Sequence, residues 1–140
     1  MREILFRAKR KDTGEWVKGY YAKYKPCASK AEHVCGIVPE YASALYMQKI
    51  DPQTLCQYTG LTDKNGQRIW ENDICKVVTE SIDEEDGFFV VRWSEEGARF
   101  ILEGDSLVMD FDNVYGTECE GVGNIFDNPE LIEGEDDDRE

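Results

Sequence analysis

The pair Asn65-Gly66, which lies between two apolar-rich runs, is the feature that most constrains the fold of this chain. It belongs to residues 57–78, QYTGLTDKNGQRIWENDICKVV. Both central residues of a type I′ turn need a positive φ, which asparagine and glycine tolerate, so the pair predicts a two-residue β-hairpin turn. The residues after it suit a half-buried sheet: Ile69, Trp70, Ile74, Val77 and Val78. We therefore expect a hairpin that leads into a barrel or a meander.

Short apolar runs separated by turn residues continue after this hairpin. Turn signals recur about every 8–12 residues, which is typical of small barrels and sandwiches. About five strands fit between Ile69 and Phe111, a number that suits an SH3-like barrel. The sequence therefore predicts a mainly β (α+β) fold, with a small SH3-like barrel in the second half and few short helices.

The composition divides the chain into three expected parts. Residues 1–56 are the N-terminal segment, with a β-hairpin whose loop at residues 12–14 (DTG) puts glycine where a positive φ is needed. Residues 57–132 are the expected barrel. Residues 133–140, EGEDDDRE, cannot bury apolar area and are expected to be a disordered acidic tail.

Two aspartate or asparagine residues precede prolines and predict short helices. Asp51 before Pro52, and Asn128 before Pro129, each combine a capping side chain with a proline in the first turn. One helical turn is expected at each position. Residues 45–50 favour a strand, because Asp51-Pro52 ends the run at once.

The charge is large and unevenly distributed. The chain has a formal net charge of −14, yet residues 1–30 hold nine Lys and Arg against three Asp and Glu. A chain with a basic beginning and an acidic remainder can pair head to tail with a second copy, but solvation of both ends is the favoured explanation of the charge pattern. The overall acidity argues against non-specific binding to nucleic acid, because phosphates would be repelled over most of the surface.

The cysteines and the first residues indicate a compartment. The five cysteines, an odd number, contain no C-x-x-C pair, so neither a zinc ribbon nor a thioredoxin-like motif fits: Cys27, Cys35, Cys56, Cys75 and Cys119. We expect reduced and mostly buried thiols, with Cys56 and Cys75 as small core residues. No signal peptide and no apolar run of about 20 residues is present, so a cytoplasmic protein without a membrane segment is expected.

Few residues are candidates for chemistry. His33, the only histidine, lies two residues before Cys35, so the two can share the face of a strand, but its neighbours are typical of a polar loop. Two carboxylate pairs, Asp110 with Asp112 and Glu71 with Asp73, can also share a face and hold a hard cation; an exposed polar face explains them better. No phosphate loop or dinucleotide motif is present. No residue is therefore predicted to be catalytic, to bind a cofactor or to bind a metal.

One stretch has the composition of a platform for single-stranded nucleic acid. Its aromatic residues alternate with Lys18, Lys23 and Lys25: Trp16, Tyr20, Tyr21 and Tyr24. A hairpin core with lysines on its rim explains the same residues and is favoured.

Two motifs resemble the YopX family of phage and prophage proteins. The first is QYTGLTDKNGQRIWENDICKV at residues 57–77, and the second is GVGNIFDNPELI at residues 121–132. The opening, REILFRAKRKDTGEWVKGYY, is similar to the N-terminal segment of that family. Asn72 stands where the family usually has glycine; asparagine tolerates the left-handed conformation, so the turn can be kept.

The resemblance implies an SH3-type barrel preceded by a smaller segment, a tendency to self-associate, and an origin in a temperate phage or prophage. It implies no activity, substrate, cofactor or catalytic residue. We therefore expect a non-enzymatic accessory protein that acts by protein–protein contact, as a homo-oligomer or on a host or phage protein, in the bacterial cytoplasm. The alternatives are an acidic DNA mimic that inhibits a host enzyme, and a nucleic-acid-binding module that uses the N-terminal basic and aromatic hairpin.

Overall fold

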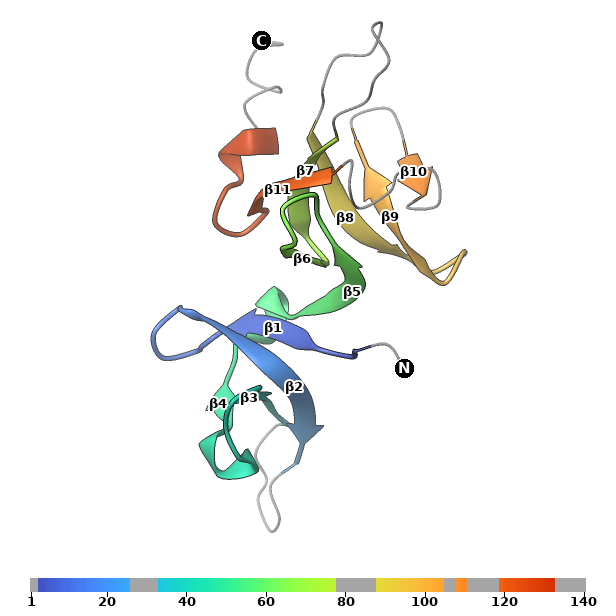
Figure 1. Cartoon of the computed structure of the whole chain (residues 1–140). Helices are drawn as coiled ribbons and strands as arrows, with labels where there is room; N and C mark the ends of the chain where they lie inside the picture. The colour runs from blue at the N-terminus through green and yellow to red at the C-terminus, as the bar shows by residue number, and fades with distance from the viewer. Residues whose placement is uncertain (1–2, 26–32, 78–87, 105–107, 111–118, 133–140) are drawn as a thin grey trace, which may run out of the picture. The chain divides into compact units, whose positions relative to one another are not determined.

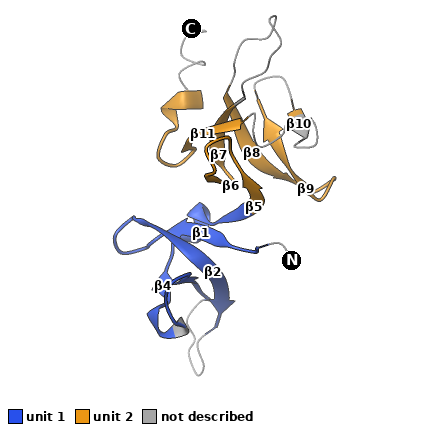
Figure 2. Cartoon of the chain, viewed as in Figure 1, with its two compact units in different colours: residues 1–58 blue, residues 59–140 orange. Residues whose placement is uncertain are grey.

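The computed structural model describes residues 3–25, 33–77, 88–104, 108–110 and 119–132. The chain forms two compact units, residues 1–58 and residues 59–140 (Figure 2). The described regular structure is almost entirely antiparallel β-sheet (Figure 1), which confirms the predicted mainly β class. The expected tail lies outside the described residues.

Unit 1 is a small sheet with two 3₁₀ turns. Its strands follow the order β4-β3-β2-β1-β5. The elements are β1 (Phe6–Lys9), β2 (Trp16–Tyr24), β3 (Val34–Pro39), η1 (Ala44–Tyr46), β4 (Gln48–Lys49), η2 (Pro52–Thr54) and β5 (Cys56–Thr62), of which β5 continues into unit 2. The expected strand at residues 45–50 is confirmed for its second half, where β4 is followed by a β-bridge at Ile50, and was wrong at residues 45 and 46, which belong to η1.

The core of unit 1 lies on one face of this sheet. Its buried residues are Ala8, Val17, Ile37 and Ile50, with Phe6 and Tyr21 packed against them. The first four residues of β2 alternate between partly or fully exposed and buried side chains, as expected for a sheet with one face on a core.

The two predicted turns of unit 1 are confirmed. Gly14 has φ of 75°, and its N–H donates to the carbonyl of Arg10 (2.9 Å) in the β1–β2 hairpin. Asp51 caps η2, because its carboxylate accepts the N–H of Gln53 at 3.0 Å. The Thr54 hydroxyl then accepts the N–H of Lys9 (2.8 Å), which fixes this turn to β1.

Unit 2 holds a five-stranded antiparallel sheet of order β10-β9-β8-β7-β11. After the end of β5 its strands are β6 (Arg68–Trp70), β7 (Asp73–Val77), β8 (Phe88–Ser94), β9 (Arg99–Glu103), β10 (Val108–Asp110) and β11 (Cys119–Asn124). The expected SH3-like closed barrel was wrong for the described strands. Closure requires the two edge strands to pair, but β10 and β11 lie at opposite edges, and β6 pairs with β5 in the other sheet.

The core of unit 2 contains residues from β6 to β11. Its buried members are Ile69, Cys75, Val91, Leu102 and Cys119. Phe89 and Phe100 pack against this cluster, and Phe100 forms an edge-on aromatic pair with Trp93, with ring centroids 5.0 Å apart.

The turn at Asn65-Gly66 exists, but its type differs from the prediction. Of the pair, only Gly66 has a positive φ (79°), so the turn is not type I′. The Gly66 N–H donates to the Asp63 carbonyl (3.0 Å), and the Asp63 carboxylate accepts the N–H of Asn65 and of Gln67, both at 2.9 Å. The aspartate side chain therefore selects a longer loop, in which only one residue needs the left-handed region.

The last described residues fold around two asparagines. The Asn124 side-chain oxygen accepts the N–H of Phe126 (3.0 Å) and of Asp127 (2.9 Å). Residues 130–132 form the expected helical turn. Asn128 was expected to cap it, but its side-chain oxygen accepts the Asn124 N–H instead (3.2 Å). The motif GVGNIFDNPELI is thus the end of β11 and a folded turn after it.

Candidate functional site

The structure gives the candidate pair His33 and Cys35 separate surroundings. His33 is exposed and precedes β3, whereas Cys35 is half-buried and packs against the core of unit 1. The hydroxyl of Tyr21 donates to the Cys35 sulfur at 3.6 Å, and this bond, with burial, raises the pKa of Tyr21. Among the described residues, no group of three His, Cys, Asp or Glu side chains could hold a metal ion.

The carboxylate pair Glu71 and Asp73 was considered on the condition of a continuous strand, and that condition is not met. Strand β6 ends at Trp70, and Asn72 turns the chain with φ of 68° before β7 begins. Asp73 is buried and accepts the Trp70 N–H (2.8 Å), which makes it a residue of this turn. The other pair, Asp110 with Asp112, extends outside the described residues.

The predicted core cysteines are buried. Cys56 and Cys75 have no exposed surface, and neither does Cys119. Burial raises the pKa of the Cys75 thiol, and the negative charge of Asp73 adds to this effect. These thiols are therefore poor nucleophiles. Cys27 lies outside the described residues.

The sheet of unit 1 has a second face, opposite to its core, which we call the cationic face. Antiparallel Cα partners point to the same side of a sheet, so the register of the strands identifies its members. They are Arg7, Lys9, Trp16, Lys18, Tyr20, Ala22, Tyr24, Val34, Gly36, Val38, Lys49 and Cys56. This set holds four cations and three aromatic residues, and it contains no Asp or Glu. Arg7 and Cys56 are buried, so the accessible cations are Lys9, Lys18 and Lys49.

Trp16 is half-buried beneath two of these cations. The guanidinium carbon of Arg7 lies 4.7 Å from the centroid of the Trp16 ring system, and Lys9 Nζ lies 5.5 Å from it. Both distances are within the range of cation–π attraction. The Trp16 ring is therefore in contact with cations of the face and is not available to stack with a ligand.

The remaining aromatic residues of β2 divide between the two faces. Tyr20 and Tyr24 are 56% and 44% exposed on the cationic face, while Tyr21 points to the core. The predicted platform residues thus keep two accessible rings. The predicted platform did not include Arg7, Lys9 and Lys49. The alternation of residues in FRAK could have placed Arg7 and Lys9 on one face of β1, whereas Lys49 joins the face only because β4 pairs with β3.

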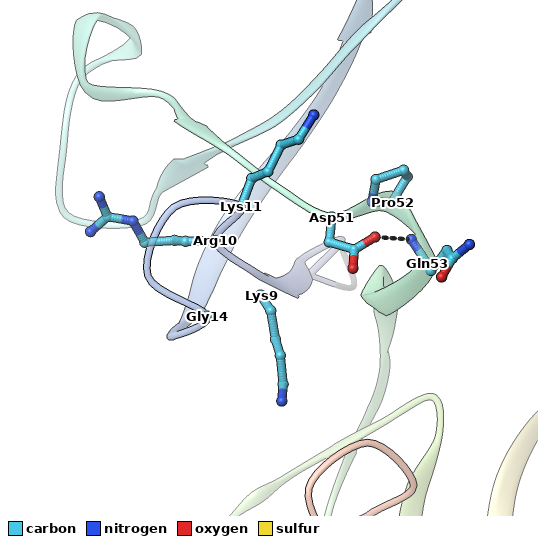
Figure 3. Close-up of a pocket in the computed structure, with 7 residues that line it drawn as sticks. All are labelled: Lys9, Arg10, Lys11, Gly14, Asp51, Pro52 and Gln53. Atoms are coloured by element: carbon cyan, nitrogen blue, oxygen red, sulfur yellow. Dashed lines mark hydrogen bonds between the residues drawn. The ribbon is translucent and has the colours of Figure 1, made fainter.

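A surface pocket of about 520 Å³ lies beside the β1–β2 hairpin (Figure 3). It is lined by Lys9, Arg10, Lys11, Gly14, Asp51, Pro52 and Gln53. Figure 3 shows the side chains of Lys9, Arg10 and Lys11 pointing in different directions. The Arg10 guanidinium donates to Asp12 at 2.9 and 3.1 Å and lowers the pKa of that carboxyl. The pocket is therefore positive but does not converge on one anion.

The segment between β3 and β4 presents apolar side chains to solvent, and we call it the aromatic loop (residues 40–46). Tyr41, Leu45 and Tyr46 are 90%, 93% and 63% exposed. Backbone bonds fold it tightly: Glu40 N–H to the Lys18 carbonyl (3.2 Å), Ala42 N–H to Pro39 (3.0 Å) and Tyr46 N–H to Ser43 (2.9 Å).

The two units carry opposite formal charges. Residues 1–58 contain ten Lys and Arg and six Asp and Glu, a balance of +4. Residues 59–140 contain six and twenty-four, a balance of −18. The asymmetry seen in the sequence thus follows the division into units.

Comparison with known proteins finds similarity along nearly the whole chain. Residues 5–133 match the profile of the family described as "YopX protein". The crystal structure of protein EF1440 from Enterococcus faecalis is similar over 94% of this chain and 99% of its own, with a TM-score of 0.59 and 22% identity, a likeness of fold. No curated protein matches the sequence. In the part of the chain that the structure describes, no helix is long and apolar enough to span a membrane.

Proposed function

We propose, from the premise that this chain belongs to the YopX family, that it is a non-enzymatic accessory protein of a phage or prophage. In this proposal it acts by protein–protein contact in the bacterial cytoplasm, and its first partner is a second copy of itself.

The exposed aromatic loop is the observation that carries the proposal. Exposed tyrosines on a rigid scaffold are typical of the residues that dominate binding energy at protein interfaces, because they bury a large area at a small loss of conformational freedom. Tyr41 and Leu45 are almost fully exposed, and backbone hydrogen bonds fix the path of the loop that carries them. Their side chains would lose most of their contact with water on binding a partner.

The opposite charges of the two units support a second copy as that partner. Unit 1 carries +4 and unit 2 carries −18, so unit 1 of one copy attracts unit 2 of another. A head-to-tail contact of this kind relies on charge for its encounter and on apolar burial for its stability. It should therefore weaken as salt is added.

Size-exclusion chromatography with light scattering, at about 0.05 M and at about 1 M NaCl, tests this proposal. At the higher concentration the Debye length falls to about 3 Å, so attraction between the units is screened. We expect a dimer or larger assembly at low salt and a shift towards monomer at high salt. A monomer at both salt concentrations would reject the proposal.

A variant identifies the surface. The double substitution Tyr41→Ser with Leu45→Ser should convert the low-salt assembly to monomer. Ile4→Ser is the matched control, since Ile4 is also an exposed apolar residue of unit 1 but lies outside the loop. Assembly that persists in the double variant would remove the aromatic loop from the interface.

A further inference from the structure

We propose that the cationic face of unit 1 binds single-stranded nucleic acid, with bases stacked on Tyr20 and Tyr24 and phosphates beside the neighbouring lysines. This proposal does not depend on self-association. It depends on the register of the sheet, which gathers cations from three strands around a row of aromatic residues.

The two tyrosines supply the stacking surface. They lie four residues apart on the same face of β2, a separation of about 13 Å at about 3.3 Å per residue. Each ring is close to half exposed or more. Ala22 lies between them on the same face and presents only a methyl group, and the Met47 side chain packs over its cross-strand partner Gly36. Aromatic rings of this kind stack with any base, which predicts little sequence preference.

The cations around the rings supply the contacts to phosphate. Lys18 precedes Tyr20 on the face, and Lys49 reaches the face from β4 through the Gly36 pairing. Lys9 lies beyond Trp16, on β1. No strand residue of this face is acidic, but Glu15 and Glu40 line a surface pocket together with Trp16 and Lys18. The field therefore favours an anion most at the part of the face that holds Tyr20, Tyr24 and Lys49.

The net charge of −14 does not prevent a local site of this kind. The Debye length is about 10 Å at 0.1 M salt, so carboxylates farther than this from the face repel a bound strand only weakly. Duplex DNA suits the face less, because its bases are stacked inside the helix and cannot reach the tyrosine rings. The geometry therefore favours single strands over duplexes.

Fluorescence anisotropy of the full chain at about 0.1 M salt tests the proposal with labelled oligothymidylate and oligouridylate of about 12 nucleotides, a length within the usual site size. A duplex of equal length and a polyglutamate competitor are the reference ligands. We expect both single strands to bind, the duplex to bind at least tenfold more weakly, and polyglutamate not to compete at equal charge. The ratio between the two oligonucleotides distinguishes DNA from RNA as the favoured ligand.

Variants separate stacking from charge. Tyr20→Ala with Tyr24→Ala should weaken binding at least tenfold, whereas the two Tyr→Phe substitutions, which keep the rings, should change it by less than about threefold. Ile4→Ala is the exposed apolar control, outside both the cationic face and the aromatic loop, and should bind like the unchanged chain. Circular dichroism should show all four chains folded, since the substituted side chains are largely exposed.

The matched charge variants are Lys49→Gln on the face and Lys64→Gln, whose cation pairs with Glu120 in unit 2 (3.4 Å). Only Lys49→Gln should lower the affinity for the oligonucleotides. It should also reduce the salt dependence of binding, by about 0.7 in the slope of log affinity against log salt. Absence of binding by both oligonucleotides, equal loss in Lys64→Gln, or unchanged binding after loss of both tyrosines would overturn the proposal. Competition by polyglutamate at equal charge would also overturn it, and would indicate a site for acidic protein segments.

Discussion

The N–H of Gly121 donates a 3.0 Å hydrogen bond to the carboxylate of Asp63, a residue 58 positions earlier in the chain. The same carboxylate accepts the N–H of Asn65 and Gln67, so one buried side chain organises its own turn and joins that turn to β11. Lys64 strengthens the junction, because its N–H donates to the Cys119 carbonyl (2.9 Å). The contact explains why an aspartate precedes the Asn-Gly pair.

Asp63→Asn should lower the free energy of unfolding of unit 2 by about 2–3 kcal/mol, because hydrogen bonds to a charged acceptor contribute about 1.5–3 kcal/mol each and the amide keeps only one acceptor. Urea denaturation followed by tryptophan fluorescence measures the change. Asp12→Asn is the control, since this carboxylate pairs with Arg10 at the exposed surface of unit 1 and its loss should change stability little. Equal effects of the two substitutions would contradict the role of Asp63.

The pH dependence of stability should also report on Asp63. Burial raises its pKa, but the N–H groups of Gly121, Gln67 and Asn65, with the charge of Lys64, together outweigh burial and leave the pKa below its ordinary value. A carboxyl with a lowered folded pKa contributes stability above the unfolded pKa of about 3.9, and this contribution is lost as the pH falls through the folded pKa.

Unfolding by urea between about pH 7 and pH 2.5 should therefore show a steeper acid loss in the unchanged chain than in Asp63→Asn, with the two curves converging at the acid end. Parallel curves over the whole range would show that another carboxyl causes the acid sensitivity.

Two non-glycine residues in the described segments have a positive φ, and their substitutions should act in opposite directions. Ala98 has φ of 50° in the β8–β9 turn, so Ala98→Gly should raise stability by about 0.5–1 kcal/mol through relief of strain. Asn72→Ala should lower it by about 1–2 kcal/mol, because alanine tolerates the left-handed region less well and loses the bond from Arg92 to the Asn72 side-chain oxygen (2.9 Å). Thermal unfolding of the two variants shows whether each substitution raises or lowers stability. A lower melting temperature for Ala98→Gly would refute the strain at that turn.

The three fully buried cysteines should resist alkylation in the folded chain. Burial, followed by the charges of Asp73, Cys119 and Asp63, raises the pKa of Cys75, so little thiolate exists at pH 8. Iodoacetamide followed by peptide mass spectrometry should label Cys35, which is half-buried, before Cys56, Cys75 and Cys119. In urea all four should react at similar rates. Rapid labelling of Cys75 without denaturant would contradict the packing of unit 2.

The local patterns were sufficient for the β class, for the position of most strands and for the two short-range turns of unit 1. Gly14 and the Asp51-Pro52 pair act within a few residues, and their backbone requirements depend little on the rest of the fold. The family resemblance, confirmed over residues 5–133, was likewise readable from two motifs.

Other features depended on contacts between distant parts of the chain. The prediction of a type I′ turn at Asn65-Gly66 was wrong because the Asp63 side chain accepts two N–H groups of the loop. An argument from turn propensities does not include this side chain. The prediction of a barrel was wrong because the number of strands does not determine which of them lie at the edges of the sheet. The candidate pairs at His33 and at Glu71 depended on continuous strands, but β3 begins after His33 and β6 ends before Glu71.

The sequence by itself determined the mainly β class, the charge asymmetry and the short-range turns, since each of these follows from composition or from neighbours along the chain. Only the tertiary structure decided which side chains share a surface. Lys49 joins Tyr20 and Tyr24 on the cationic face because β4 pairs with β3 and β3 with β2, and Asp63 meets Gly121 because β11 returns beside β7. Strand pairing is set by packing over the whole domain, and no single stretch of residues encodes it.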